Sequence, residues 1–179
     1  MILIVDMNSS RLGFSEFVLP LCALVEPLQY DVVHYTQVSR ISAYQKIILS
    51  GVPLKDNEYL HDVHLFDWIK SCDTPILGIC AGMQVIGLVF NSLLNQCQEI
   101  GMTKIQTVRT NFLFSSTFTA YELHTCSIIP SDELEILATS EKCIQVIKHR
   151  KKEIYGVLFH PEVRNKNIIK QFILGSSRP

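Results

Sequence analysis

The sequence lacks a long apolar run, a paired-cysteine motif and an excess of positive charge. No apolar run reaches the roughly 20 residues that a membrane span needs, so we expect no membrane segment. The apolar start at residues 1–6 has no basic region and no small-residue cleavage site, so we interpret it as a buried strand and not as a signal peptide. The net charge is −1, which disfavours a nucleic-acid partner because no basic surface would neutralise the phosphates.

The six cysteines stand singly, without a Cys-x-x-Cys pair. A chain of 179 residues can bury a full hydrophobic core without disulfides. We therefore expect reduced thiols and a cytoplasmic location. The hydrophobic share is 47% and the charged share 18%, which is typical of a globular protein. Because we find no repeat or linker, we expect one domain over residues 1–179.

Short apolar runs alternate with amphipathic segments in the first half. Runs rich in Ile, Val and Leu without polar alternation are typical of parallel strands that are covered on both faces. This alternation predicts an α/β fold, with an open, mostly parallel twisted sheet and helices on both faces, as in flavodoxin-like proteins. We expect strands at residues 2–5, 31–35, 46–49 and 75–79 and helices at 12–28, 57–72 and 81–94.

The second half consists of short strand-like runs separated by turns, which predicts a small antiparallel or mixed extension of the sheet. The expected strands are 103–108, 117–123, 134–139, 143–148 and 154–159, followed by a helix at 163–174 and a loose tail at 175–179.

The most informative stretch is GICAGMQ at residues 78–84. A buried strand ends, Cys80 follows, and a helix begins at once, with glycines two residues before and after the cysteine. This is the cysteine form of a nucleophile elbow, in which a sharp turn exposes the nucleophile. The helix start favours the thiolate, and the N–H of Ala81 would face a developing oxyanion. A buried structural cysteine in a βα turn is about equally consistent with this stretch alone.

A strand also runs into His160, Pro161 and Glu162. Glu162 could accept a hydrogen bond from one imidazole nitrogen and leave the other for the thiol, as in a nucleophile–base–orienter triad. Taken alone, the stretch is more typical of a surface turn that opens a helix. Combined with Cys80, it favours the triad.

The loop after the strand at 46–49 reads Ser50-Gly51-Val52-Pro53. If this strand neighbours the elbow strand, the N–H of Gly51 or Val52 could supply a second oxyanion donor. Considered alone, the loop is a turn.

Together these motifs resemble the class I, or triad, glutamine amidotransferases. That family's G-x-C-x-G-x-Q, H-P-E and S-G-G-P motifs correspond to GICAGMQ, His160–Glu162 and SGVP. Residues 136–162 are most similar to the amidotransferase subunits of archaeal GMP synthases. The similarity extends over the whole length of the chain.

The resemblance implies that Cys80 attacks the side-chain amide of L-glutamine and that His160, oriented by Glu162, acts as the base. It implies that Ala81 with Gly51 or Val52 binds the oxyanion. Gln84, Leu123 and His124 would contact the substrate, and Tyr121 is a further candidate for the pocket. The ammonia would pass to a separate synthase subunit, and the hydrolysis needs no metal and no organic cofactor.

Several positions depart from the family pattern. Val52 replaces the second glycine of the loop, and Leu123 and Cys126 replace the Ser and Asp of S-H-x-D. Residues 8–11 stand where GMP synthases commonly carry a Gly-Gln pair, so we do not extend the resemblance to the acceptor reaction. Two alternatives stay open: a stand-alone γ-glutamyl hydrolase or peptidase on the same triad, and a degenerate regulatory subunit.

One segment has a spacing that could gather metal ligands on a single helix face, with His61, Asp62, His64 and Asp67. No second segment offers a ligand, and we favour an exposed helix face. The sequence therefore predicts no metal site.

Overall fold

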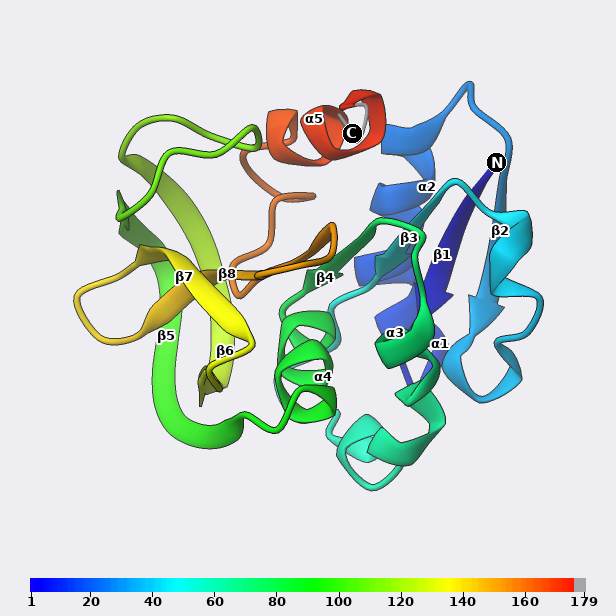
Figure 1. Ribbon diagram of the computed structural model, residues 1–179, viewed down its shortest axis with the longest axis horizontal. Helices are drawn as coiled ribbons and strands as arrows, with labels where there is room; N and C mark the ends of the chain where they lie inside the picture. Colours follow the sequence, from blue (N-terminus) through cyan, green and yellow to red (C-terminus); the bar gives the residue numbers. More distant parts are fainter. Residues whose placement is uncertain (176–179) are drawn as a thin grey trace.

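The computed structural model describes residues 1–175, which build a nine-stranded sheet with helices on both faces (Figure 1). The strands follow the order β2-β1-β3-β4-β9-β8-β7-β5-β6. Their bounds are β1 Ile2–Asp6, β2 Tyr30–His34, β3 Lys46–Leu49, β4 Ile76–Ile79, β5 Leu93–Thr107, β6 Phe118–Ile129, β7 Leu134–Thr139, β8 Ile144–His149 and β9 Ile154–Val157. The α-helices are α1 Arg11–Gly13, α2 Leu19–Val25, α3 Trp68–Ser71, α4 Ala81–Val89 and α5 Asn167–Leu174.

The five strands β2, β1, β3, β4 and β9 are parallel, as the apolar runs predict. Ile4, Ile48 and Leu77 lie side by side across β1, β3 and β4 and pack with α2 and α5. The alternate residues of the same strands, such as Leu3, pack with α4 on the other face. Both faces of the parallel half are therefore buried, and its side-chain core has two layers.

The strands β9, β8, β7, β5 and β6 pair antiparallel, which confirms the predicted extension. Its longest element, β5, pairs with β6 over most of its length and then with β7 at Gln106 and Thr107. The expected strand at 103–108 is only the last part of β5. The expected helix at 81–94 is too long, because Asn91 has a φ of 61° and ends α4 in the left-handed region.

The expected helix at 12–28 is replaced by α1, a π-helical turn at Phe14–Val18, and α2. Pro20 lies in the first turn of α2, where its missing N–H needs no partner. The wide π-turn before it lets the chain continue in a helical path despite the proline. The predicted segment is helical up to Val25, but its prediction as one regular helix is wrong.

The prediction of one continuous helix at 57–72 is wrong, because the segment forms three short helical turns. Two 3₁₀ turns, Glu58–Leu60 and Val63–Phe66, precede the single turn of α3. Asp62, between the two turns, accepts a hydrogen bond from the Tyr35 hydroxyl at 2.9 Å. Asp favours local conformations that compete with a regular helix.

The last helix also begins later than expected, at Asn167. Asn165, just before it, has a φ of 72°, a left-handed conformation that no helix can continue through. The tail predicted at 175–179 lies beyond the described residues except for Gly175. Within residues 1–175, no helix is long and apolar enough to cross a membrane.

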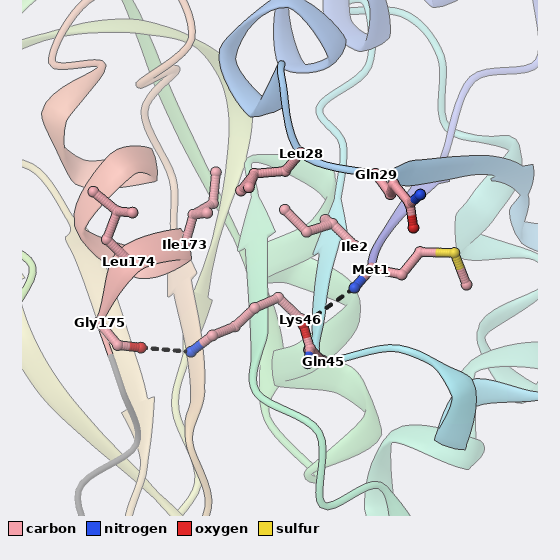
Figure 2. Close-up of a pocket in the computed structure, with 9 residues that line it drawn as sticks. All are labelled: Met1, Ile2, Leu28, Gln29, Gln45, Lys46, Ile173, Leu174 and Gly175. Atoms are coloured by element: carbon pink, nitrogen blue, oxygen red, sulfur yellow. Dashed lines mark hydrogen bonds between the residues drawn. The ribbon is translucent and has the colours of Figure 1, made fainter.

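A pocket of about 460 Å³ opens where the parallel strands begin (Figure 2). Lys46 lines it and donates to the Gly175 carbonyl oxygen at 2.8 Å, and the Met1 ammonium donates to Gln45 at 3.1 Å. Burial lowers the pKa of Lys46. Sites in parallel sheets lie at the opposite edge, where the strands end, and Cys80 lies there.

Candidate active site

Cys80 occupies a strained turn between β4 and α4. Its φ is 50° and its ψ −102°, which is rare for a residue with a Cβ. Its backbone N–H donates to the Val157 carbonyl oxygen of β9 at 2.8 Å, which fixes the turn to the neighbouring strand. Ala81 opens α4, so its N–H lies in the first turn, where helical N–H groups lack helical partners. This geometry is that of a nucleophile elbow.

The two glycines of the elbow permit close packing. A Cβ on Gly78 would lie 2.5 Å from the backbone of Gly82, and a Cβ on Gly82 would lie 2.7 Å from the Cβ of Leu49. Real Cβ atoms do not approach so closely. Both positions therefore need glycine for β3, β4 and α4 to meet.

His160 and Glu162 form a buried pair just beyond β9. Nδ1 of His160 lies 2.7 Å from Oε1 of Glu162, and both side chains are fully buried. The backbone N–H of His160 donates to the Tyr121 carbonyl oxygen at 2.9 Å. The imidazole ring packs against the ring of Phe17, with the two ring centroids 5.2 Å apart. The strand, the backbone bond and the aromatic contact hold the imidazole in one orientation.

The charge state of His160 follows from its neighbours. Burial acts to lower the pKa of His160, but the charges of Glu162 and Cys80 and the hydrogen bond to Glu162 raise it well above its usual value. The cationic imidazole is therefore favoured beside the carboxylate. Nε2, the second nitrogen, has no hydrogen-bond partner among the described residues. This nitrogen is free to exchange a proton with the thiol of Cys80.

The thiol of Cys80 is directed toward β6. Its Sγ donates to the Leu123 carbonyl oxygen at 3.8 Å. Cys80 is 4% exposed. Leu123 thus contacts the nucleophile through its backbone, which the sequence pattern does not show.

The loop after β3 lies against the base. A Cβ on Gly51 would be 2.7 Å from Cε1 of His160, so only glycine fits without displacing the ring. The Gly51 carbonyl oxygen accepts from Nδ2 of Asn8 at 3.3 Å and from Oγ of Ser50 at 3.0 Å. Because a trans peptide places N–H opposite C=O, the N–H of Val52 points away from Asn8 and Ser50. The described non-glycine residues with positive φ do not include Val52, so its β-branched side chain is not strained here.

Gln84 lies one turn beyond Cys80 on α4, and both of its polar atoms have protein partners. The Tyr59 hydroxyl donates to Oε1, and Nε2 donates to the Cys126 carbonyl oxygen at 2.8 Å. Burial, followed by the charges of Cys80 and Cys126, raises the pKa of Tyr59, so this phenol stays protonated and can donate. In this conformation Gln84 connects α4 to β6.

A narrow cavity of about 20 Å³ lies between these elements. Its lining includes the side chains or backbones of Val52, Tyr59, Cys80, Gln84 and Leu123. A cavity of roughly 10–15 Å³ on this measure holds one water molecule, so a glutamine side chain needs more room than this conformation provides.

His124 lines the same cavity but directs its ring elsewhere. Nδ1 donates to the Cys97 carbonyl oxygen at 3.0 Å, since a carbonyl can only accept. Nε2 faces Glu122 at 3.2 Å and Glu99 at 3.6 Å. Burial raises the pKa of Glu122, which the neighbouring His124 partly counteracts.

The structure brings together most of the residues that the motifs indicate. Cys80, Gln84, Leu123, His124 and Val52 border one cavity, and Gly51 contacts His160. Sequence reasoning did not find Phe17, Tyr59 or Asn8, because their contacts depend on pairings between distant segments.

The potential metal-binding groups of the described residues lie beside this site. Two sets converge: Cys97 with Glu99 and Cys143, and Glu99 with Glu122 and His124. Among the described residues, the histidines of the segment 61–67 belong to neither set.

Comparison with known proteins identifies related chains. The model of the family "Glutamine amidotransferase class-I" matches residues 21–174. A subunit of the glutamine-hydrolysing GMP synthase of Methanocaldococcus jannaschii is 36% identical over 137 residues, which cover 70% of this chain and 71% of that protein. The glutamine-hydrolysing GMP synthase of Petrotoga mobilis is 34% identical over 157 residues, 81% of this chain but only 31% of that longer protein.

Solved structures of similar proteins have the same fold as this chain. A Thermoplasma acidophilum protein described as a GMP synthase subunit superposes with a TM-score of 0.82 at 26% identity, covering 97% of this chain and 92% of that one. A glutamine amidotransferase from Thermotoga maritima gives a TM-score of 0.73 at 20% identity, covering 97% and 80%, and supports the fold.

Proposed function

Because this chain belongs to the class-I glutamine amidotransferase family, we propose that it hydrolyses the side-chain amide of glutamine at Cys80 and supplies the ammonia to a separate synthase subunit. The observation that carries this proposal is the elbow cysteine, with φ of 50°, beside a histidine whose other nitrogen is bound by a buried carboxylate. Family membership supplies the substrate class, and the geometry supplies a nucleophile and a base.

In the proposed reaction the thiolate of Cys80 attacks the amide carbon of glutamine. The carbonyl electrons move to oxygen, where the N–H groups of Ala81 and Val52 (or Gly51) would bind the developing charge. His160, protonated on Nε2, donates that proton to the departing nitrogen, and ammonia leaves. A γ-glutamyl thioester remains on Cys80.

Water then attacks the thioester with His160 as base, and glutamate leaves as the thiolate re-forms. Glu162 accepts from Nδ1 throughout, so Nε2 always faces the reacting atoms. Gln84, Leu123 and His124 would position the substrate from α4 and β6. We propose no metal or organic cofactor for this hydrolysis.

The partner we propose is the synthase subunit of a GMP synthase, because the relatives described above carry that name. The narrow cavity at Cys80 must widen before glutamine enters, and we propose that partner binding widens it. These relatives favour partner-dependent hydrolysis over a stand-alone γ-glutamyl hydrolase. The six free cysteines suit a reducing compartment, so we propose the cytoplasm, and we treat residues 1–179 as a single amidotransferase domain.

The test is the release of ammonia and glutamate from glutamine by the purified chain, alone and with the synthase subunit from the same source. We expect a low rate alone, a much higher rate in the complex, and no hydrolysis by Cys80→Ala in either sample. Hydrolysis that survives Cys80→Ala would exclude this nucleophile. Equal rates with and without the partner would instead favour the stand-alone hydrolase.

A further inference from the structure

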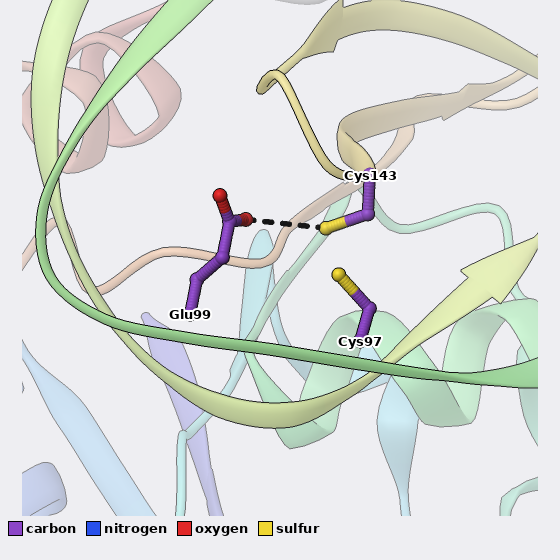
Figure 3. A group of neighbouring side chains, drawn as sticks. All are labelled: Cys97, Glu99 and Cys143. Atoms are coloured by element: carbon purple, nitrogen blue, oxygen red, sulfur yellow. Dashed lines mark hydrogen bonds between the residues drawn. The ribbon is translucent and has the colours of Figure 1, made fainter.

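Three side chains close to the candidate active site converge on one another and have no role in the proposed reaction. Cys97 and Glu99 belong to β5, and Cys143 directly precedes β8. One potential ligand atom from each lies within 4.8 Å of the other two. Figure 3 shows the two sulfur atoms and the carboxylate directed toward one another from two separate segments of the chain.

We propose that Cys97, Glu99 and Cys143 bind a thiophilic divalent cation such as Zn²⁺. Thiolate and carboxylate ligands of zinc lie about 2.3 Å and 2.0–2.2 Å from the ion, which places neighbouring tetrahedral ligand atoms roughly 3.5 Å apart. Sγ of Cys143 and Oε2 of Glu99 are 3.3 Å apart, close to this spacing. Three protein ligands leave a fourth position for water or for a nearby imidazole.

The charges around the cluster favour a cation. Glu99 and Glu122 are both buried, and no lysine or arginine of the described chain forms an ion pair with either. Among the described residues, His124 is the one basic side chain that lies close to both carboxylates. A buried carboxylate without a counter-charge is costly even where it accepts hydrogen bonds, and a divalent ion at Glu99 would offset that cost.

An unsatisfied nitrogen faces the same cluster. Nδ1 of His124 carries its proton toward the Cys97 carbonyl, so Nε2 of the neutral ring presents a lone pair. This nitrogen is buried, has no hydrogen-bond partner in the described structure, and lies 3.6 Å from Oε2 of Glu99. Both carboxylate oxygens of Glu122, next to it, also lack hydrogen-bond partners there. Nε2 of His124 and the Glu122 carboxylate are therefore placed either to bind the ion directly or to contact the side chains that bind it.

The carboxylate of the cluster is already oriented by its surroundings. Oγ of Ser140 and Nε2 of Gln145 donate to Oε2 of Glu99 at 2.9 and 2.7 Å. Such outer contacts are typical of metal ligands, whose direction they fix. Zinc binds the thiolate form of cysteine, so metal binding must displace the thiol protons and will strengthen as the pH rises.

The bound ion would fasten β5 to the turn before β8, at the place where the register between β5 and β6 shifts. The Cys97 carbonyl oxygen accepts a hydrogen bond from His124 of β6. The same strand contacts the candidate active site, because its Leu123 carbonyl accepts from Cys80 and its Cys126 carbonyl accepts from Gln84. We therefore assign the ion a structural role behind the candidate active site.

The test is Co²⁺ and Zn²⁺ binding by the full chain after treatment with a chelator. We expect wild type to bind one ion with a thiolate-to-cobalt charge-transfer band in the near ultraviolet. Cys97→Ser and Cys143→Ser should lose at least about 100-fold in affinity, more than changes to outer-shell contacts typically cost. Cys80→Ser and Cys72→Ser are the matched controls and should keep the band.

Each protein is also melted with and without Zn²⁺, because a ligand that binds the native state raises Tm. Zn²⁺ should raise Tm in wild type and Cys80→Ser but not in Cys97→Ser, whose partly exposed position tolerates substitution better than a buried core position would. A band retained in Cys97→Ser, a band lost in Cys80→Ser, or folded wild type without binding would each overturn the proposal. None of these readouts depends on glutamine hydrolysis.

Discussion

Oε1 of Glu162 lies 2.7 Å from Nδ1 of His160 in an interior where neither side chain contacts solvent. This pair raises the pKa of His160 despite the opposing effect of burial, which is the largest single influence on it. The first prediction concerns Glu162→Gln. A neutral amide cannot stabilise the imidazolium, and it can present its NH₂ group to Nδ1. We expect glutaminase activity to fall by roughly 10²–10⁴-fold.

The same variant has a defined pH signature. Because the folded-state pKa of His160 lies above its unfolded value of 6.5, the pair stabilises the protein fully below that pH. The stabilisation is lost as the pH rises through the folded pKa. Urea unfolding at a series of pH values should show Glu162→Gln less stable than wild type by roughly 1–3 kcal/mol near pH 6. This difference in unfolding free energy should shrink as the pH becomes alkaline. The exposed Glu16→Gln is the control, and a gap that widens with pH would refute the pairing.

The second prediction concerns Gly51→Ala. The new Cβ would lie 2.7 Å from Cε1 of His160 and must displace the imidazole. A displacement of about 1 Å can cost roughly 100-fold in rate, so we expect kcat to fall by that order. Gly101→Ala is the contrast, because Gly101 has a φ of +103° and open space around it. It should lose stability without a comparable loss of kcat, and equal losses in both variants would argue against steric contact with the base.

The third prediction concerns Gln84→Ala. The substitution leaves the Tyr59 hydroxyl and the Cys126 carbonyl without their partner in the interior. We expect a loss of roughly 2–6 kcal/mol in unfolding free energy, from two buried groups at about 1–3 kcal/mol each. Chemical unfolding measures it, with the exposed Gln171→Ala as control. A loss below that of the control would mean that Gln84 does not hold α4 to β6.

The elbow and the His-Pro-Glu segment could be predicted because their signals are local. An apolar strand, a glycine on each side of Cys80 and a helix start are adjacent in sequence, and the structure uses those glycines for close packing. The parallel half of the sheet was predictable for the same reason, since its apolar runs carry no alternation.

The rest depends on contacts between distant segments. Tyr59 reaches Gln84, Asn8 reaches Gly51, and Asp62 accepts from Tyr35, which interrupts the expected helix at 57–72. The predicted substrate contacts of Leu123 and His124 remain predictions: in this conformation Leu123 offers a carbonyl to Cys80, and the ring of His124 faces Glu99 and Glu122. The proposed metal site departs from the sequence, which predicted none, because Cys97 and Cys143 meet only through the pairing of strands.

The central claim, that Cys80 is a nucleophile specific for glutamine, is tested most directly by covalent labelling. The full chain is incubated with a glutamine-like electrophile and its peptides are mapped by mass spectrometry. We predict one adduct, on Cys80, which excess glutamine prevents and His160→Ala slows, while Cys80→Ala stays unlabelled. Labelling spread over several cysteines, or an adduct on Cys80 that glutamine does not prevent, would contradict the claim.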